Sequence, residues 1–237
     1  MTIFAGTSGW AYPAWKPEFY PPKLAAAKFL SFYSSRVNST EVNFTFRRFP
    51  TAKLLDGWIA ATPENFKFAI KAHQSITHIK RLHDADEVTT RFIDALQPLH
   101  DAGKLGPVLF QLPPYLKFDA TLLANFLASL PRKRRVAFEF RDASWFCDEI
   151  FALLRGANAA LCIAESEKLE TPSVQTADFC YLRLRDPEKL SAPKARKELT
   201  ARVKDLAQRG DIFAYFKHED SPEGVLHAEE LLAQMGK

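Results

Sequence analysis

The feature that most constrains the fold is the alternation of short strand-like runs with helical segments along the whole chain. The apolar residues of the short runs recur at a period of two, and those of the longer segments recur at the helical period of 3.6. The predicted strands are Ile3–Ser8, Ser39–Asn43, Lys67–Lys71, Pro107–Leu112, Val136–Phe140, Ala160–Glu165, Phe179–Leu184 and Ile212–Lys217. The predicted helices are Leu24–Arg36, Thr51–Ala61, Glu87–Ala102, Ala120–Leu130, Trp145–Arg155, Lys194–Arg209 and Leu226–Met235.

This alternation predicts parallel strands that are joined by right-handed crossovers. Eight strands in 237 residues fit a single (β/α)8 TIM-type barrel domain over residues 1–237, since such barrels have about 250 residues. The segment Glu165–Asp178 is too short for a helix with two loops, so we expect the sixth helix to be degenerate. An open doubly wound sheet is the alternative, but GTSGW at Gly6–Trp10 is not its GxGxxG fingerprint.

The charge and the cysteine content narrow the classes of protein. A formal net charge of +4 is compatible with an anionic ligand and is too small to indicate nucleic-acid binding by itself. The 3 cysteines show no CxxC spacing, which argues against a disulfide framework or a zinc knuckle. No secretory signal or membrane-spanning apolar run is evident, so we expect a cytoplasmic protein without a membrane partner.

The stretch VAFEFRDASW, Val136–Trp145, places Glu139 and Arg141 on one face of a predicted strand. Alternate residues of a barrel strand face the interior, and active sites form at the carboxyl ends of the strands. The same rule brings further polar residues to that mouth: Glu41, Asn43, Lys71, Gln111, Glu165, Tyr181, Arg183, Arg185 and Lys217. We expect Glu139 to pair with Lys71 or Arg183, and Arg141 to pair with Glu41 or Glu165.

Such a cluster could be purely structural, since buried charges can satisfy one another. Barrel interiors consist mainly of bulky aliphatic residues, however, so a mouth this rich in ionisable groups favours a functional site. The loop after the first strand adds aromatic residues on the same side. Its Trp10 and Tyr12 could stack on a base or a sugar ring or merely close the rim, whereas we expect Phe19 and Tyr20 to pack against the rim.

Motifs along nearly the whole chain resemble those of the DUF72, or YecE-like, family. They include GTSGWAYPAWKPEFYP from Gly6, TEVNFTFRRFP from Thr40, FKFAIKAHQSITH from Phe66, LGPVLFQLPP from Leu105, AFEFRDASW from Ala137, YLRLR from Tyr181 and YFKHEDSPEGVLHAEEL from Tyr215. The resemblance implies a (β/α)8-type barrel but no reaction. It implies these motif positions: Trp10, Tyr12, Glu41, Asn43, Lys71, Thr77, His78, Gln111, Pro113, Glu139, Arg141, Trp145 and Arg183.

The chain departs from the family pattern after the seventh and eighth predicted strands. Arg185 and Asp186 stand where the family usually has His and Gly, and Lys217 and His218 replace two asparagines. These changes add positive charge at the strands where many barrels bind phosphate.

Together these features predict an enzyme that performs hydrolase- or lyase-type acid/base chemistry on an anionic, phosphate-containing substrate at the carboxyl-terminal mouth. The candidate catalytic residues are Glu139 and Glu41 as acid and base and Lys71 as an orienting group or nucleophile. The candidate substrate-binding residues are Arg141, Arg183, Asn43, Gln111, Trp10, Tyr12, His78 and Lys217.

The alternative is a non-enzymatic module that binds a small anion or nucleic acid. The basic runs Pro131–Arg135 and Pro193–Lys197 could contact a nucleic-acid backbone. No cofactor is predicted. A divalent metal is a weaker alternative, because the possible ligands lack HxH or HExxH spacing and have cationic surroundings; they are His73, His78, Glu41, Glu139 and Glu165.

Overall fold

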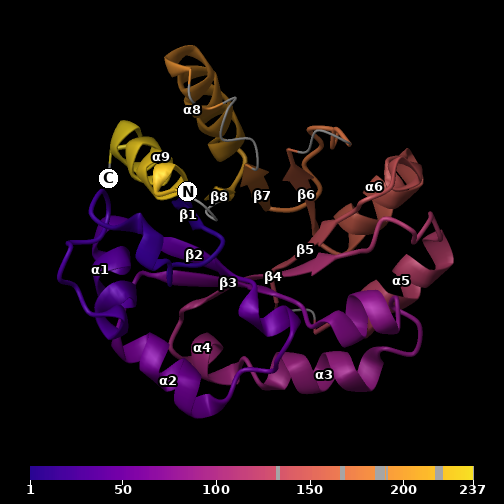
Figure 1. Ribbon diagram of the computed structural model, residues 1–237. Helices are drawn as coiled ribbons and strands as arrows, with labels where there is room; N and C mark the ends of the chain where they lie inside the picture. The colour runs from indigo at the N-terminus through magenta and orange to yellow at the C-terminus, as the bar shows by residue number, and fades with distance from the viewer. Residues whose placement is uncertain (132–133, 166–168, 185–189, 191, 217–220, 237) are drawn as a thin grey trace.

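A nearly closed ring of eight parallel strands forms the frame of the protein (Figure 1). The computed structural model describes residues 1–131, 134–165, 169–184, 190, 192–216 and 221–236. The strands are β1 (Ile3–Thr7), β2 (Ser39–Val42), β3 (Lys67–Lys71), β4 (Leu105–Gln111), β5 (Val136–Glu139), β6 (Ala160–Ala164), β7 (Phe179–Leu184) and β8 (Asp211–Phe216). They are hydrogen-bonded in the order β1-β8-β7-β6-β5-β4-β3-β2, which confirms the predicted barrel and all of its predicted strands.

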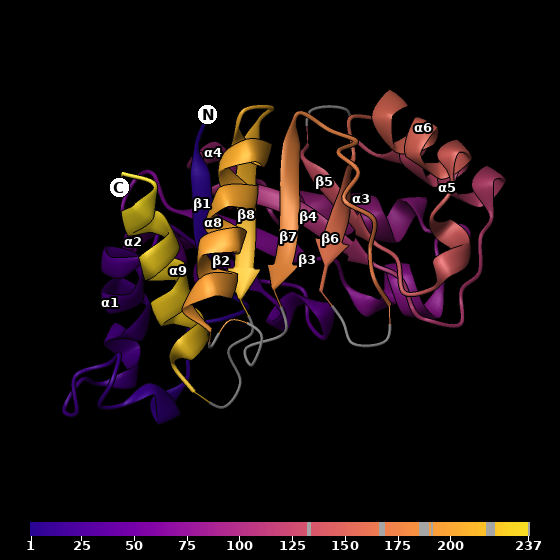
Figure 2. The same ribbon diagram turned by 90° about the horizontal axis from the view of Figure 1, so that it is seen from above.

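Helices cover the outside of this ring (Figures 1 and 2). They are α1 (Phe29–Arg36), α2 (Ala52–Ala60), α3 (Asp86–Asp94), α4 (Gln97–Asp101), α5 (Ala120–Ser129), α6 (Asp148–Gly156), α8 (Pro193–Ala207) and α9 (Glu223–Gln234). The described residues between β6 and β7, which are 165 and 169–178, contain no helix, as expected for the degenerate sixth helix. In the part of the chain that the structure describes, no helix combines the length and the apolar character needed to span a membrane.

The alternation of side chains along the strands separates two apolar regions. Outward residues such as Phe68, Phe110 and Phe138 join the helices in the main core. Inward residues such as Phe4 and Phe213, whose rings stack at 4.7 Å, fill the interior of the barrel. This apolar layer plugs the ring and separates the polar groups at the carboxyl ends of the strands from those at the amino ends.

Side chains close the seam between β1 and β2, the two strands at the ends of the hydrogen-bonded order. The amide of Asn38 accepts from and donates to the backbone of β1. The hydroxyl of Tyr33 accepts from the Thr7 N–H at 2.7 Å and donates to the Ser39 carbonyl at 3.1 Å. Burial raises the pKa of Tyr33 to about 12, so the phenol stays protonated and remains a donor.

This close approach requires glycine at position 6. A Cβ on Gly6 would lie 1.8 Å from the Ser39 carbonyl oxygen and 2.6 Å from the Tyr33 hydroxyl. We expect Gly6→Ala to destabilise the protein by about 3 kcal/mol, the upper end of the usual overpacking cost, because backbone must move. Urea denaturation provides the measurement.

The matched control for that substitution is Gly57→Ala in α2, where an added Cβ meets nothing within 4 Å. Alanine is the better helix former by about 0.5–1 kcal/mol, so this variant should be slightly more stable than the parent. Equal stability of the two variants would contradict the side-chain closure of the seam.

Candidate functional site

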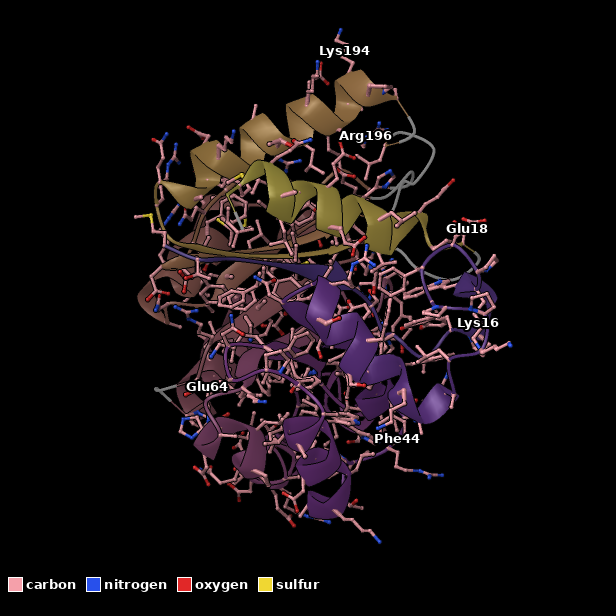
Figure 3. The ribbon with its side chains drawn as sticks, turned by 90° about the vertical axis from the view of Figure 1, so that its left-hand side faces the viewer. Lys16, Glu18, Phe44, Glu64, Lys194 and Arg196 are labelled. Atoms are coloured by element: carbon pink, nitrogen blue, oxygen red, sulfur yellow. The ribbon has the colours of Figure 1, made fainter. Side chains whose placement is uncertain are left out.

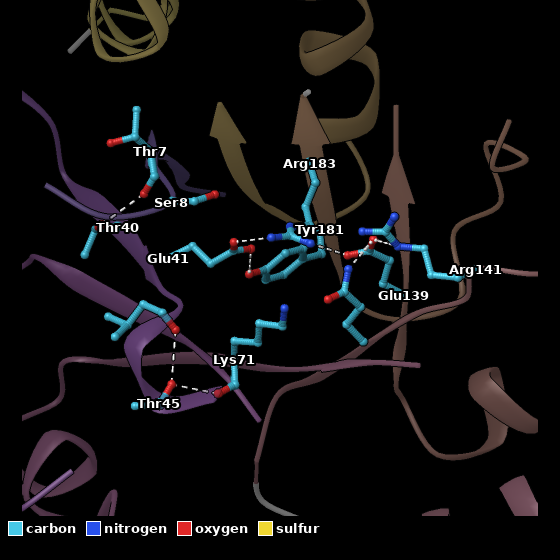
Figure 4. A network of polar contacts seen from close by, with 12 residues as sticks. Thr7, Ser8, Thr40, Glu41, Thr45, Lys71, Glu139, Arg141, Tyr181 and Arg183 are labelled. Atoms are coloured by element: carbon cyan, nitrogen blue, oxygen red, sulfur yellow. Dashed lines mark hydrogen bonds and ion pairs between the residues drawn. The ribbon is translucent and has the colours of Figure 1, made fainter. Parts of the chain in front are cut away.

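Three charged side chains from three separate strands meet at the carboxyl-terminal mouth of the barrel (Figure 4). Glu41 from β2, Glu139 from β5 and Arg183 from β7 have exposed fractions of 0%, 1% and 1%. The Arg183 Nη2 lies 2.6 Å from the Glu41 Oε1, and its Nη1 is ion-paired with the Glu139 Oε2. We call these three residues the glutamate–arginine cluster. The predicted Glu139–Arg183 pair is confirmed.

Neighbouring residues occupy the remaining carboxylate oxygens of the cluster. Tyr181 donates its hydroxyl to Glu41 Oε2 at 2.8 Å, and Gln111 donates its amide to Glu139 Oε1 at 2.9 Å. Burial, and then the charge of Glu41, raise the pKa of Tyr181 well above its usual value, so this phenol stays protonated. The carboxylates are therefore held by fixed partners.

The partner of Arg141 differs from the prediction. Its Nε lies 2.6 Å from Glu139 Oε1, so Arg141 pairs with Glu139 and the predicted pairing with Glu41 or Glu165 is wrong. The reason is that Arg141 follows Glu139 by two residues on the same face. Glu165 has the opposite parity to the interior residues of β6, and its Oε1 lies 3.6 Å from Arg202 Nη1 of α8 instead.

Lys71 and His78 lie beside the cluster and share one aromatic neighbour. Lys71 extends from the end of β3 toward the cluster (Figure 4), with its Nζ 4.2 Å from the ring centre of Phe46. His78, in the π-helical turn η4 (Ser75–Ile79), packs edge-on against the same ring at 4.9 Å. Sequence reasoning missed Phe46; its signal was an aromatic residue shortly after the end of β2, in the turn η3 (Phe44–Phe46).

Burial and neighbouring positive charges favour the neutral form of His78. Burial is the main cause that lowers the pKa of His78, and the positive charges of Lys71 and Arg141 lower it further. The Nδ1 of His78 lies 2.9 Å from the Thr77 hydroxyl. His78 is only partly buried, so a neutral imidazole can meet a ligand at the mouth and accept a proton.

The charges at the mouth are arranged in layers. The two carboxylates are fully buried, whereas Lys71 is partly exposed and the Arg141 side chain is 33% exposed. Arg183, Lys71 and Arg141 also outnumber the two glutamates. Among the described residues of this cluster, the charged side chains that reach solvent are therefore cationic, which favours an anionic ligand.

Three predicted site residues line a different cavity. Trp10, Tyr12 and Asn43 lie around a cavity of about 610 Å³ between the loop after β1, the turn η3 and α2. Phe19 and Tyr20 are buried, as expected for residues that pack the loop against the rim. Four positions at which the chain departs from the family pattern lie outside the described residues: Arg185, Asp186, Lys217 and His218.

The described side chains gather no three carboxylate, imidazole or thiol groups in a way that could hold a metal ion. Glu41 and Glu139 are instead engaged by Arg183.

Fold and site together define a (β/α)8-type barrel protein with a buried acidic pair and an exposed cationic layer at its mouth. The chain belongs to the family described as "Protein of unknown function DUF72", whose model matches residues 4–237.

Its relatives fall into the same family. The chain is 32% identical over 154 residues to the UPF0759 protein YunF of Bacillus subtilis, a match that covers 61% of this chain and 52% of that protein. It is 28% identical over 145 residues to the UPF0759 protein YecE of Escherichia coli K12, covering 61% and 50%. The matched region therefore spans about half the length of these curated relatives.

Solved structures show the same fold. A DUF72 family protein from Thermotoga maritima superimposes with a TM-score of 0.87 at 24% identity, covering 100% of both chains. One from Enterococcus faecalis gives 0.81 at 17% identity, covering 98% of this chain and 96% of that one. At these identities, the likeness establishes the barrel and nothing about the reaction.

Proposed function

We propose that this protein is an enzyme that performs hydrolase- or lyase-type acid/base chemistry on an anionic, phosphate-containing substrate at the carboxyl-terminal mouth. The observation that carries the proposal is the layered charge, with Lys71 and Arg141 toward solvent and Glu41 and Glu139 beneath them. Arginine binds phosphate through its planar fork and lysine binds it as a point charge.

Each group at the mouth has a role that follows from its exposure. Lys71 and Arg141 bind the anion, and Glu139 positions Arg141 through the 2.6 Å ion pair. His78, neutral and partly exposed, transfers a proton. The predicted acid/base roles of Glu41 and Glu139 stay a prediction, because both carboxylates are buried against Arg183 and would first need a change of partners.

A panel of phosphate monoesters and diesters tests the enzymatic activity, with ³¹P NMR as the readout of phosphate release or elimination. We expect turnover of at least one compound, and a loss of about 10²-fold or more in His78→Gln, the usual contribution of a general acid or base. Binding of the compounds without any turnover would contradict the proposed enzymatic activity and support the alternative of a non-enzymatic anion-binding module.

The pH dependence of that turnover reports on His78. Because burial and neighbouring cations lower its pKa below the ordinary value of 6.5, folded His78 loses its proton at a lower pH than free histidine does. We expect kcat/KM to decline as the pH falls, with the midpoint of the decline below pH 6.5. The decline should be absent in His78→Gln; a decline that persists in this variant belongs to another group.

A non-enzymatic module that binds nucleic acid has less support than one that binds a small anion. Arg135 precedes β5, at the end opposite to the mouth, and is ion-paired with Asp211 at 2.9 Å. Lys194 and Arg196 lie at the start of α8 (Figure 3), after the carboxyl end of β7. Arg135 therefore lies at the opposite end of the barrel from Lys194 and Arg196, which disfavours a single groove formed by the described residues of the two basic runs.

A further inference from the structure

An aromatic cavity lies beside the charged mouth, and the proposed chemistry does not use it. It has a volume of about 610 Å³, which is within the usual range for a small-molecule site. Its lining includes five aromatic side chains, and its polar residues are Ser8, Asn43, Arg48 and Thr51. The aromatic residues are Trp10, Tyr12, Phe44, Phe49 and Trp58. We call it the aromatic pocket. Phe44 is 44% exposed, so the pocket reaches solvent at this side chain. Figure 3 shows Phe44 on the same side of the molecule as Lys16 and Glu18.

The pocket is rigid on its inner side. Trp10 meets Trp58 edge-on at 5.4 Å and Phe68 at 6.2 Å, and Trp58 stacks on Phe68 at 5.5 Å. Tyr12 packs against the fully buried Trp15 at 4.9 Å and donates its hydroxyl to the Ser8 carbonyl at 3.1 Å. These contacts fix the rings before a ligand arrives, as a stacking site for a flat ring requires.

Asn43, one of the polar residues that line the pocket, has an acceptor atom without a hydrogen-bond partner among the described residues. The Asn43 Oδ1 is buried and accepts no hydrogen bond within the described part of the chain. A buried acceptor is costly to leave unsatisfied, so this atom favours a ligand with an N–H group at its edge. Aromatic walls with one such acceptor match a heteroaromatic ring better than a plain hydrocarbon.

A single turn of helix separates this pocket from the anion-binding groups. In η3, Phe44 lines the pocket, whereas Phe46 contacts Lys71 at 4.2 Å. Thr45 between them donates its hydroxyl to the carbonyl of Lys71 at 2.7 Å and thereby fixes the turn on β3. Phe44 and Phe46 are two residues apart in this type of helix, so their backbone positions differ by about 4 Å along its axis.

We propose that the substrate is a phosphate ester that carries a flat heteroaromatic ring, of the nucleoside monophosphate class. The ring enters the aromatic pocket and donates to Asn43, and the phosphate reaches Lys71 and Arg141. The assignment of the phosphate rests on the proposed function, whereas the assignment of the ring rests on the pocket alone.

Calorimetry at pH 7 tests the proposal with AMP, GMP, CMP, UMP, their nucleosides and ribose 5-phosphate as probes. We expect at least one nucleotide to bind 10-fold or more tightly than ribose 5-phosphate. Trp10→Ala should remove this advantage and leave the binding of ribose 5-phosphate unchanged, while Trp10→Phe should keep most of it. Phe118→Ala removes a partly exposed aromatic residue that does not line the pocket, so it is the matched control and should bind like the parent.

The outcomes separate the two proposals. If ribose 5-phosphate binds as tightly as every nucleotide, the aromatic pocket is not a ring site and this inference is overturned, while the anionic substrate stands. If a nucleoside binds as tightly as its monophosphate, the pocket is a ring site and the anionic substrate is overturned. If no nucleotide binds, the inference is overturned, and the phosphate-ester panel alone decides the proposed function.

Discussion

Replacing Arg183 by Met is expected to destabilise the protein by about 3–5 kcal/mol, the usual cost of removing one partner from a buried ion pair. Methionine fills a similar volume but leaves the carboxylates of Glu41 and Glu139 facing each other at 0% and 1% exposure. Tyr181 and Gln111 would still donate to them, and Arg141 would still pair with Glu139, but the buried positive charge that joins the two carboxylates would be lost. Urea denaturation of the parent and the variant measures the difference.

Two further variants show whether the buried carboxylates cause this loss. Adding Glu41→Gln and Glu139→Gln to Arg183→Met removes both charges and should recover a large part of the stability. Arg36→Met is the matched surface control, because the Arg36–Glu229 pair has the same 2.6 Å separation with a 47% exposed arginine side chain. It should cost at most about 1 kcal/mol. Equal losses for Arg183→Met and Arg36→Met would contradict the buried cluster.

The double substitution Lys71→Met/Arg141→Met is expected to weaken the binding of inorganic phosphate by about 10²–10⁴-fold. Each charge-assisted hydrogen bond contributes about 1.5–3 kcal/mol, and every 1.4 kcal/mol corresponds to a factor of ten. The fold should survive, because Glu139 keeps Arg183 and Gln111 as partners after Arg141 is removed. Calorimetric titration with phosphate measures the affinities.

Lys117→Met supplies the control for that experiment. Lys117 is ion-paired with Asp142, and its side chain is 69% exposed, so the variant removes an exposed cation that is paired outside the glutamate–arginine cluster. Its affinity for phosphate should stay within a factor of two of the parent. Unchanged affinity in the double variant would show that phosphate binds elsewhere.

The barrel and the glutamate–arginine cluster were predictable because both follow from the two-residue period with which side chains alternate between the faces of a strand. Glu41, Glu139, Tyr181 and Arg183 share one parity near the ends of their strands, and barrel closure then forces them together. The seam between β1 and β2 was not predictable, because Asn38 joins the strands through its side chain and leaves no periodic signal.

The errors and omissions lie where the chain leaves the strands. The predicted Arg141–Glu165 pair is wrong for two reasons. The parity of β6 places Glu165 outside the barrel, and Arg141 has a partner two residues away along its own strand. Trp10 and Asn43 were placed correctly at the mouth end, but the path of a loop has no period, so their separate pocket could not be foreseen. Phe46 was missed for the same reason.

A crystal structure of the protein grown with inorganic phosphate tests the anion-binding mouth most directly. We expect a phosphate whose oxygens lie about 2.7–3.2 Å from both the Lys71 Nζ and the Arg141 guanidinium, with the glutamate–arginine cluster intact beneath it. A mouth that holds only water, with phosphate bound at other positions, would contradict the account.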